Sequence, residues 1–157
     1  MKKLKFLTNY YSSLSLQLKK LINQTDICEE IIKKIKKIKI NKKKVIIFGN
    51  GGSASTASHF STDLTKNARV RCINFNESNL ITCFSNDYGY ENFVKQALNE
   101  YGDKGDLLIL LSVSGESKNL INASKFCKNK KIGLITLTGQ RNNNSLIKSN
   151  KNGINLH

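Results

Sequence analysis

Five short apolar runs separated by helical stretches constrain the fold of this chain more than any other feature. The runs are KVIIFG (44–49), VRCINF (70–75), DLLILLS (106–112), KIGLITLT (131–138) and GINLH (153–157). Between them, the pattern predicts helices at about 53–66, 77–85, 89–101 and 117–129. Apolar strands that alternate with helices are typical of a parallel sheet covered on both faces. The sequence therefore predicts an α/β fold, a three-layer sandwich with a five-stranded parallel sheet.

Two amphipathic helices are expected ahead of the first strand. In the first, six large apolar residues recur at helical spacing: Leu4, Leu7, Tyr11, Leu14, Leu18 and Leu21. The second carries isoleucines from Ile27 to Ile38, with Thr25 or Asp26 as its cap. We expect a helical segment, residues 1–43, followed by one α/β domain, residues 44–157. The segment could pack on this domain or on a neighbouring subunit, and the sequence leaves both arrangements open.

The composition excludes several classes of protein. With 39% hydrophobic and 24% charged residues, the 157-residue chain can bury a core and is not of the disordered type. No stretch approaches the roughly 18 uncharged apolar residues of a membrane span, and the N-terminus lacks the continuous apolar core of a signal peptide. The four cysteines are scattered, which argues against a zinc ribbon or a disulfide framework. We expect a cytoplasmic protein with buried, reduced thiols and no membrane partner.

The formal net charge of +15 suggests a nucleic-acid partner as one hypothesis. The lysines concentrate in KKIKKIKINKKK (33–44), but no aromatic residues that could stack on bases are interleaved with them. The chain is also rich in Lys, Asn and Ile and has no proline. An AT-rich genome produces that bias without selection for a partner. We favour this compositional explanation, and binding of nucleic acid by this basic run remains the weaker hypothesis.

A glycine-rich stretch, GNGGS (49–53), follows the first apolar run. In parallel sheets of this kind, ligands gather at the carboxyl ends of the strands. Glycines there let the backbone turn sharply beside a ligand, and Ser53 can cap the helix that follows. The stretch has neither the GxGxxG spacing of a dinucleotide site nor the lysine of a Walker loop. Neither nucleotide-binding motif is therefore supported.

A serine-rich stretch, SVSGESKN (112–119), follows the third run. Ser112, Ser114 and Ser117 surround Gly115 where a helix is expected to begin. Backbone N–H groups and the helix dipole make such a start a good anion site. Serine hydroxyls are neutral donors and suit a phosphate monoester better than a carboxylate. A capped helix with serines that bind nothing would show the same pattern, so this stretch alone does not distinguish an anion site from an ordinary helix start.

Two further pairs of polar residues are candidates. Asn86 and Asp87, in SNDYGYE (85–91), are expected in a turn before a helix, where such residues are ordinary caps. His59 and Asp63 are four residues apart, which places them on one face of the helix that begins near Ser53. Taken alone, that pair is typical of a solvated surface without catalytic work.

Together, these motifs resemble the sugar isomerase (SIS) domain family and, within it, the phosphoheptose isomerase branch. The matching stretches are FGNGGSASTASHF (48–60), SNDYGYENFVKQ (85–96), GDLLILLSVSGESKN (105–119) and IGLITLTG (132–139). The resemblance covers nearly the whole chain. It implies isomerisation of sedoheptulose 7-phosphate to D-glycero-D-manno-heptose 7-phosphate by proton transfer through an enediolate, for surface polysaccharide. It also implies a homotetramer. A non-catalytic SIS module that binds a phosphorylated sugar or a protein partner is the alternative.

The resemblance also implies roles for individual residues. Those that would bind substrate are Asn50, Gly51, Gly52, Ser53, Asn86, Asp87, Ser112, Val113, Ser114 and Ser117. His59 and Asp63 would be ligands of Zn²⁺, and Asp63 would also be the catalytic base. Asp63 stands where the family has glutamate, and a carboxylate displaced by about 1 Å can cost on the order of 100-fold in rate.

Beyond its last strand, the family carries a helix with an RIQE…H-like motif that completes the metal site. The sequence up to His157 does not contain this motif. His59 and Asp63 are two protein ligands, whereas a catalytic zinc ion usually has three. We therefore expect a SIS domain that lacks this helix, with an incomplete metal site.

Overall fold

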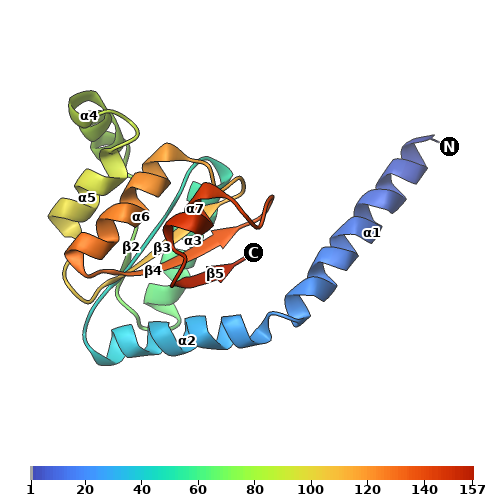
Figure 1. Cartoon of the computed structure of the whole chain (residues 1–157), viewed down its shortest axis with the longest axis horizontal. Coiled ribbons are helices and arrows are strands. Elements are labelled where there is room, and N and C mark those ends of the chain that lie inside the picture. The colour runs from blue at the N-terminus through green and yellow to red at the C-terminus, as the bar shows by residue number, and fades with distance from the viewer. Residues whose placement is uncertain (1) are drawn as a thin grey trace.

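A five-stranded parallel sheet forms the centre of the computed structural model, which describes residues 2–157 (Figure 1). Its strands are β1 (Val45–Gly49), β2 (Cys72–Ile73), β3 (Leu107–Ser112), β4 (Gly133–Thr138) and β5 (Ile154–Leu156). They lie in the order β2-β1-β3-β4-β5, and every neighbouring pair is parallel. The predicted sheet is confirmed, and all five carboxyl ends lie at the same edge.

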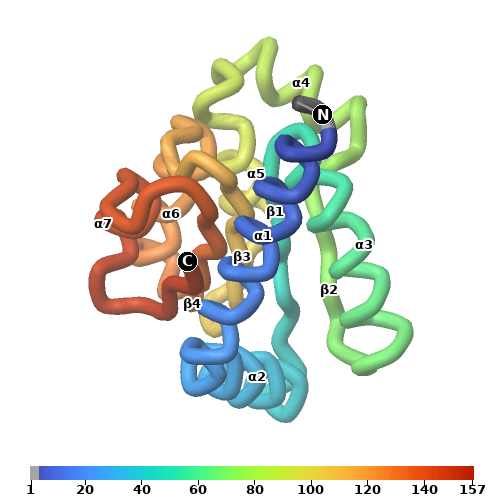
Figure 2. The backbone as a smooth tube through the Cα atoms, turned by 90° about the vertical axis from the view of Figure 1, so that its right-hand side faces the viewer, coloured from blue at the N-terminus to red at the C-terminus, as the bar shows by residue number. Residues whose placement is uncertain are grey.

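Helices cover both faces of the sheet, as Figure 2 shows from the side. They are α1 (Lys2–Ile22), α2 (Thr25–Ile40), α3 (Gly52–Lys66), α4 (Ser78–Tyr88), α5 (Phe93–Tyr101), α6 (Lys118–Lys130) and α7 (Ser145–Ser149). The helices α2 and α3 pack on one face, against residues such as Ile47 and Ile109. The helices α5 and α6 pack on the other, against Phe48 and Leu110. Alternate side chains of each strand enter opposite cores, which explains why the strands are apolar throughout.

Several local predictions differ from the structure. The strand expected at 70–75 is only two residues long, and the helix expected at 89–101 begins at Phe93. The helix α4 continues past its predicted end at residue 85 to Tyr88, because the residue that ends it is Gly89, where φ is +82°. Glu77 caps its start by accepting from the Asn79 N–H. The polar stretch at 141–152, for which no helix is predicted, contains the short helix α7. The N-cap residue of α2 is Gln24, whose side chain makes no capping hydrogen bond, so neither Thr25 nor Asp26 caps this helix.

The helix α1 projects away from the domain (Figure 1). Its six regularly spaced apolar residues are exposed, from 44% at Leu21 to 75% at Leu4. Within residues 2–157, no helix combines the length and the apolar character that crossing a membrane requires. The face that the sequence predicts to be buried is therefore not covered by any other part of residues 2–157.

A buried carboxylate lies at the amino end of the sheet. Asp106 is 2% exposed, and its side chain forms an ion pair of 2.6 Å with Lys44 Nζ. Burial lowers the pKa of Lys44, but hydrogen bonds to Asp103 and Asp106 outweigh it and hold that pKa above its usual value. The hydrogen bond from Lys44 lowers the pKa of Asp103. This cluster ties the loop before β3 to the start of β1, at the edge opposite the glycine-rich stretch.

All four cysteines are free, as expected, but they are not all buried. Cys127 lies in the core, and burial raises the pKa of its thiol to about 12. Cys72 is half-buried in β2, and Cys83 is exposed on α4. The expectation of buried thiols is therefore confirmed for Cys127 and wrong for Cys83.

Candidate functional site

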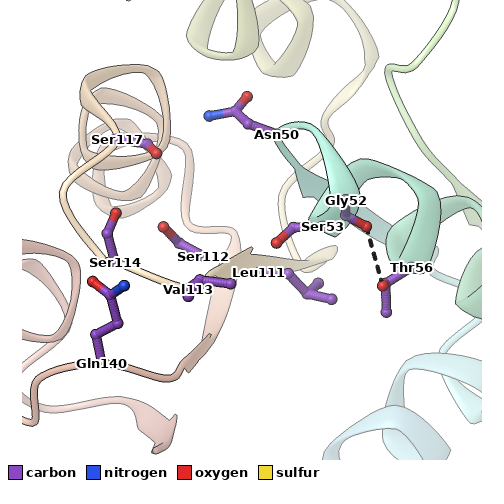
Figure 3. A pocket seen from close by; sticks show the side chains of 10 residues that line it. All are labelled: Asn50, Gly52, Ser53, Thr56, Leu111, Ser112, Val113, Ser114, Ser117 and Gln140. Carbon is purple, nitrogen blue, oxygen red and sulfur yellow. Dashed lines mark hydrogen bonds between the residues drawn. The ribbon is translucent and has the colours of Figure 1, made fainter. Parts of the chain in front are cut away.

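An open pocket of about 420 Å³ lies at the carboxyl ends of β1 and β3 (Figure 3). Two loops surround it, one leading from β1 into α3 and the other from β3 into α6. Its lining residues are Asn50, Gly52, Ser53, Thr56, Leu111, Ser112, Val113, Ser114, Ser117 and Gln140. Seven of these ten were predicted from the sequence as substrate-binding residues. The structure therefore brings the glycine-rich and serine-rich stretches to one place.

The glycine-rich loop folds tightly onto the first turn of α3. A Cβ atom at Gly49 would lie 2.7 Å from both Cβ and the carbonyl oxygen of Ser53, so only glycine allows this approach. Gly51 has a φ of +55° and forms the N-cap of α3 without a side-chain bond. Ser53 lies inside the helix and does not cap it, contrary to prediction. Its hydroxyl lines the pocket instead.

The serine-rich loop directs hydroxyl groups into the pocket. Ser112 Oγ accepts from the Gly115 N–H at 3.0 Å, and Ser114 Oγ accepts from the Glu116 N–H at 3.2 Å. Since each oxygen accepts a bond from the backbone, each hydroxyl hydrogen remains available to donate to a ligand. Ser117 is the N-cap of α6, with no bond from its side chain to the helix. The three hydroxyls are thus neutral donors beside the positive end of a helix dipole.

The helix α7 holds this loop from behind. The Leu146 N–H donates to the Gly115 carbonyl at 2.9 Å, and the Ser145 N–H donates to Glu116 Oε1 at 3.0 Å. Hydrogen bonds from the side chain and the backbone of Ser145 lower the pKa of Glu116 below its usual value. Both ends of the Gly115–Glu116 turn are therefore fixed by the segment that follows β4.

The predicted metal ligands lie on α3, outside the lining of the pocket. His59 Nε2 is 3.4 Å from Asp63 Oδ2, which confirms that the two share a helix face, and their side chains are 82% and 48% exposed. Asp63 Oδ1 also accepts from Asn67 Nδ2 at 3.1 Å. Among residues 2–157, no group of three or more His, Cys, Asp or Glu side chains could hold a metal ion. The pair alone does not complete a zinc site.

Three predicted substrate-binding residues also lie outside the pocket lining. Gly51 is exposed on the loop, and Asn86 and Asp87 are exposed in the last turn of α4. Placing these two in a turn before a helix was wrong, because α4 runs on to Tyr88. The Asn86 side chain donates to Asp87 Oδ1 at 3.0 Å. Their contact with a ligand stays a prediction.

Sequence reasoning missed Thr56, Leu111 and Gln140 as lining residues. Thr56 lies one helical turn after Gly52 and Ser53, so the helical spacing contained the signal. Gln140 follows the end of β4, at the same edge of the sheet as the other lining residues. The contribution of Asn119, which hydrogen-bonds to Asn50 from α6, could not be read from local patterns.

Comparison with known proteins places the chain in a family. The profile of the SIS domain matches residues 9–139, which is most of the sequence. The chain therefore belongs to the SIS domain family.

The chain is also homologous to phosphoheptose isomerases. It is 40% identical to the phosphoheptose isomerase of Buchnera aphidicola subsp. Acyrthosiphon pisum (strain Tuc7) over 114 residues, which are 69% of this chain and 58% of that protein. It is 42% identical to that of Hamiltonella defensa over 103 residues, 62% of this chain and 50% of that protein. The chain thus spans only about half the length of the curated relatives it matches.

Solved structures support the same fold. A phosphoheptose isomerase from Neisseria gonorrhoeae superimposes with a TM-score of 0.68 and 29% identity, covering 74% of this chain and 64% of that one. One from Francisella tularensis gives a TM-score of 0.86 over 96% of this chain and 82% of that one. At 24% identity, this second match shows the fold alone. The predicted α/β architecture with N-terminal helices is confirmed.

Proposed function

We propose that the pocket binds a phosphorylated sugar and that the protein is an aldose–ketose isomerase. Its substrate would be sedoheptulose 7-phosphate and its product D-glycero-D-manno-heptose 7-phosphate, a precursor for surface polysaccharide. The observation that carries the proposal is the convergence of Ser112, Ser114 and Ser117 at the N-terminus of α6, opposite the glycine-rich loop. The similarity to proteins named phosphoheptose isomerase supports the choice of sugar.

The serine hydroxyls suit the phosphate end of such a ligand. A phosphate monoester has several acceptor oxygens and negative charge, and the serine-rich loop offers donors beside a helix N-terminus. Within the part of the chain that the structure describes, no lysine or arginine lines the pocket. Hydroxyls and backbone dipoles would therefore supply the recognition, with the surrounding excess of positive charge acting at longer range.

Isomerisation requires a base that moves a proton between neighbouring carbons. We assign this role to Asp63, and the predicted contacts of Asn86 and Asp87 to the sugar hydroxyls. Gly52, Thr56, His59 and Asp63 follow one another at spacings of three or four residues, so they form one stripe along α3. A sugar whose phosphate lies at the serine-rich loop would extend along this stripe.

Zn²⁺ held by His59 and Asp63 remains part of the proposal. A zinc ion in this position would stabilise the developing enediolate oxygens. The described residues supply two ligands, so the site does not form from this chain segment alone. We assign no step of the reaction to the metal.

We also propose that the protein is a homo-oligomer that associates through α1. Leu4, Leu7, Tyr11, Leu14, Leu18 and Leu21 alternate in steps of three and four residues, as the core positions of a coiled coil do. All six are exposed, and a second copy of α1 would cover them. Leu14→Glu should dissociate the oligomer in sedimentation experiments. Leu16→Glu, on the other side of the helix, should leave the oligomer intact. Equal dissociation by both variants would contradict association through the face that carries Leu14.

A second candidate is a SIS module that binds a phosphorylated sugar without converting it. The incomplete group of metal ligands around His59 favours it. The two candidates share the pocket and differ only in catalysis.

An isomerase assay separates these candidates. The protein is incubated with sedoheptulose 7-phosphate, with and without Zn²⁺, and the aldose product is followed by NMR. The proposal expects product from the unaltered chain and a rate of isomerisation at least about 100-fold lower in Asp63→Asn. A separate variant, Asp87→Asn, tests the proposed contact of Asp87 with the sugar hydroxyls. Asp103→Asn, at the far edge of the sheet, is the control. Binding without product would establish the second candidate, and absence of binding would contradict both.

A further inference from the structure

A buried amide lies directly behind the pocket residue Asn50. Asn119, the second residue of α6, is 2% exposed. Its Oδ1 accepts from Asn50 Nδ2 at 3.0 Å, and its Nδ2 donates to Asn50 Oδ1 at 2.9 Å. The two side-chain amides thus form a closed pair that joins the glycine-rich loop to α6, between residues 69 positions apart in the chain. Figure 3 shows Asn50 at the start of α3, with its amide nitrogen directed toward α6.

A backbone group fixes the orientation of this pair. The Leu120 N–H donates to Asn119 Oδ1 at 3.0 Å, while sharing its hydrogen with the Ser117 carbonyl at 3.1 Å. A backbone N–H can only donate, so the atom of Asn119 facing it must be oxygen. The nitrogen of Asn119 then faces Asn50. Because this nitrogen is a donor, the atom of Asn50 that it contacts must be the acceptor oxygen, Oδ1.

Tyr90 completes the arrangement from the loop before α5. Its hydroxyl donates to Asn50 Oδ1 at 3.2 Å. This oxygen therefore accepts two hydrogen bonds, which uses both of its lone pairs. Asn50 Nδ2 has two hydrogens, and one of them is bonded to Asn119. Among the described residues, the side chain of Asn50 therefore has one polar group without a partner, a single N–H donor.

We propose that Asn119 is a positioning residue that, together with Tyr90, holds Asn50 as a donor toward an oxygen of the bound ligand. The inference rests on the proposed function for the identity of that ligand, a phosphorylated sugar whose hydroxyl, carbonyl or phosphate oxygens are acceptors. An unconstrained Asn50 would rotate and offer donor and acceptor alike. Asn119 thereby makes the site selective for an acceptor without touching the ligand.

Hydrogen exchange tests the positioning without any ligand. In the unaltered chain, one Asn50 amide proton should exchange about fivefold more slowly than the other, as expected for one hydrogen bond. In Asn119→Ala, the two protons should exchange at similar rates. Asn122→Ala is the matched control, because Asn122 lies on the same helix but donates to the Glu91 carbonyl. Equal exchange of both Asn50 protons in the unaltered chain would overturn the inference.

A double-mutant cycle tests whether Asn119 acts through Asn50. Calorimetric titration with sedoheptulose 7-phosphate should give about fivefold weaker binding for Asn119→Ala, and no further loss when Asn119→Ala is added to Asn50→Ala. Equal losses in both backgrounds would assign Asn119 a merely structural role and overturn the inference. If Asn119→Ala does not fold, the near-isosteric Asn119→Asp replaces it in the exchange experiment; this change replaces the amide donor with a carboxylate oxygen and also adds a negative charge. If the unaltered chain binds no sugar phosphate, the proposed function fails, and the exchange experiment still decides the inference.

Discussion

Gly115 is the residue whose replacement should disturb the pocket most directly through the backbone. It forms the turn between Ser114 and Glu116, with a φ of +68°. A Cβ atom added there would overlap the side chain of Asn144, lying 2.7 Å from its Cβ. Asn144 is 2% exposed and cannot move away easily. It caps α7 by accepting from the Ile147 N–H at 3.0 Å and donates to the Arg141 carbonyl at 2.6 Å.

The expected cost of Gly115→Ala has two parts. A left-handed backbone conformation costs a residue other than glycine about 1–2 kcal/mol. Forcing an extra methyl group into a packed site costs about 1–3 kcal/mol. The free energy of unfolding should therefore fall by about 2–5 kcal/mol. In a domain of this size, each kcal/mol lowers Tm by roughly 2–4 °C.

Urea denaturation followed by circular dichroism measures this cost. Gly139→Ala is the matched control, because Gly139 lies at the same edge of the sheet and an added Cβ would meet only the Val113 backbone, at 3.8 Å or more. Its free energy of unfolding should change by less than about 1 kcal/mol. If Gly115→Ala were no more destabilising than Gly139→Ala, the close packing of Gly115 against Asn144 would be refuted.

Two other substitutions test the charges that support the fold. Lys44→Met should lower the free energy of unfolding by about 3 kcal/mol in urea denaturation, because it leaves the buried Asp106 without its ion pair. Lys42→Met, on an exposed turn, should have little effect on this free energy. Equal effects of the two variants would contradict a stabilising role of the Lys44–Asp106 ion pair. Glu116 has a lowered pKa in the folded protein, so its ionised form stabilises the fold above the usual value of 4.5, and that stability is lost as the pH falls through the lowered value. Glu116→Gln should therefore make the decline of Tm below pH 4.5 less steep. Glu30→Gln, on α2, should leave this decline unchanged. If the decline in Glu116→Gln were also unchanged, the contact between Glu116 and Ser145 would be contradicted.

The sheet could be predicted because its determinants are local. Runs such as DLLILLS and KIGLITLT are apolar at successive positions, and only a strand buried on both faces requires that. The ends of helices were harder, because single contacts decide them. The helix α7 forms within a polar stretch since the Asn144 side chain caps it and Leu146 is fully buried.

The pocket was predictable to the extent that its residues follow the ends of strands. Ser112 ends β3 and Ser114 follows two residues later, so the general rule for parallel sheets identifies both. The bonds that fix the side chains are different. Asn50 and Asn119 are 69 positions apart, and only the folded chain brings their amides together. A pattern along the sequence can name Asn50 as a candidate, but it cannot show which of its atoms faces a ligand.

Calorimetric titration of the full chain with sedoheptulose 7-phosphate tests the central claim most directly, that the serine-rich loop binds the phosphate of a sugar. The account predicts one site per chain and binding at least about tenfold weaker in Ser114→Ala, the loss of a hydrogen bond to a charged group. Ser55→Ala, on the exposed side of α3, should bind like the unaltered chain. Absence of binding by the unaltered chain, or equal binding by Ser114→Ala, would contradict the claim.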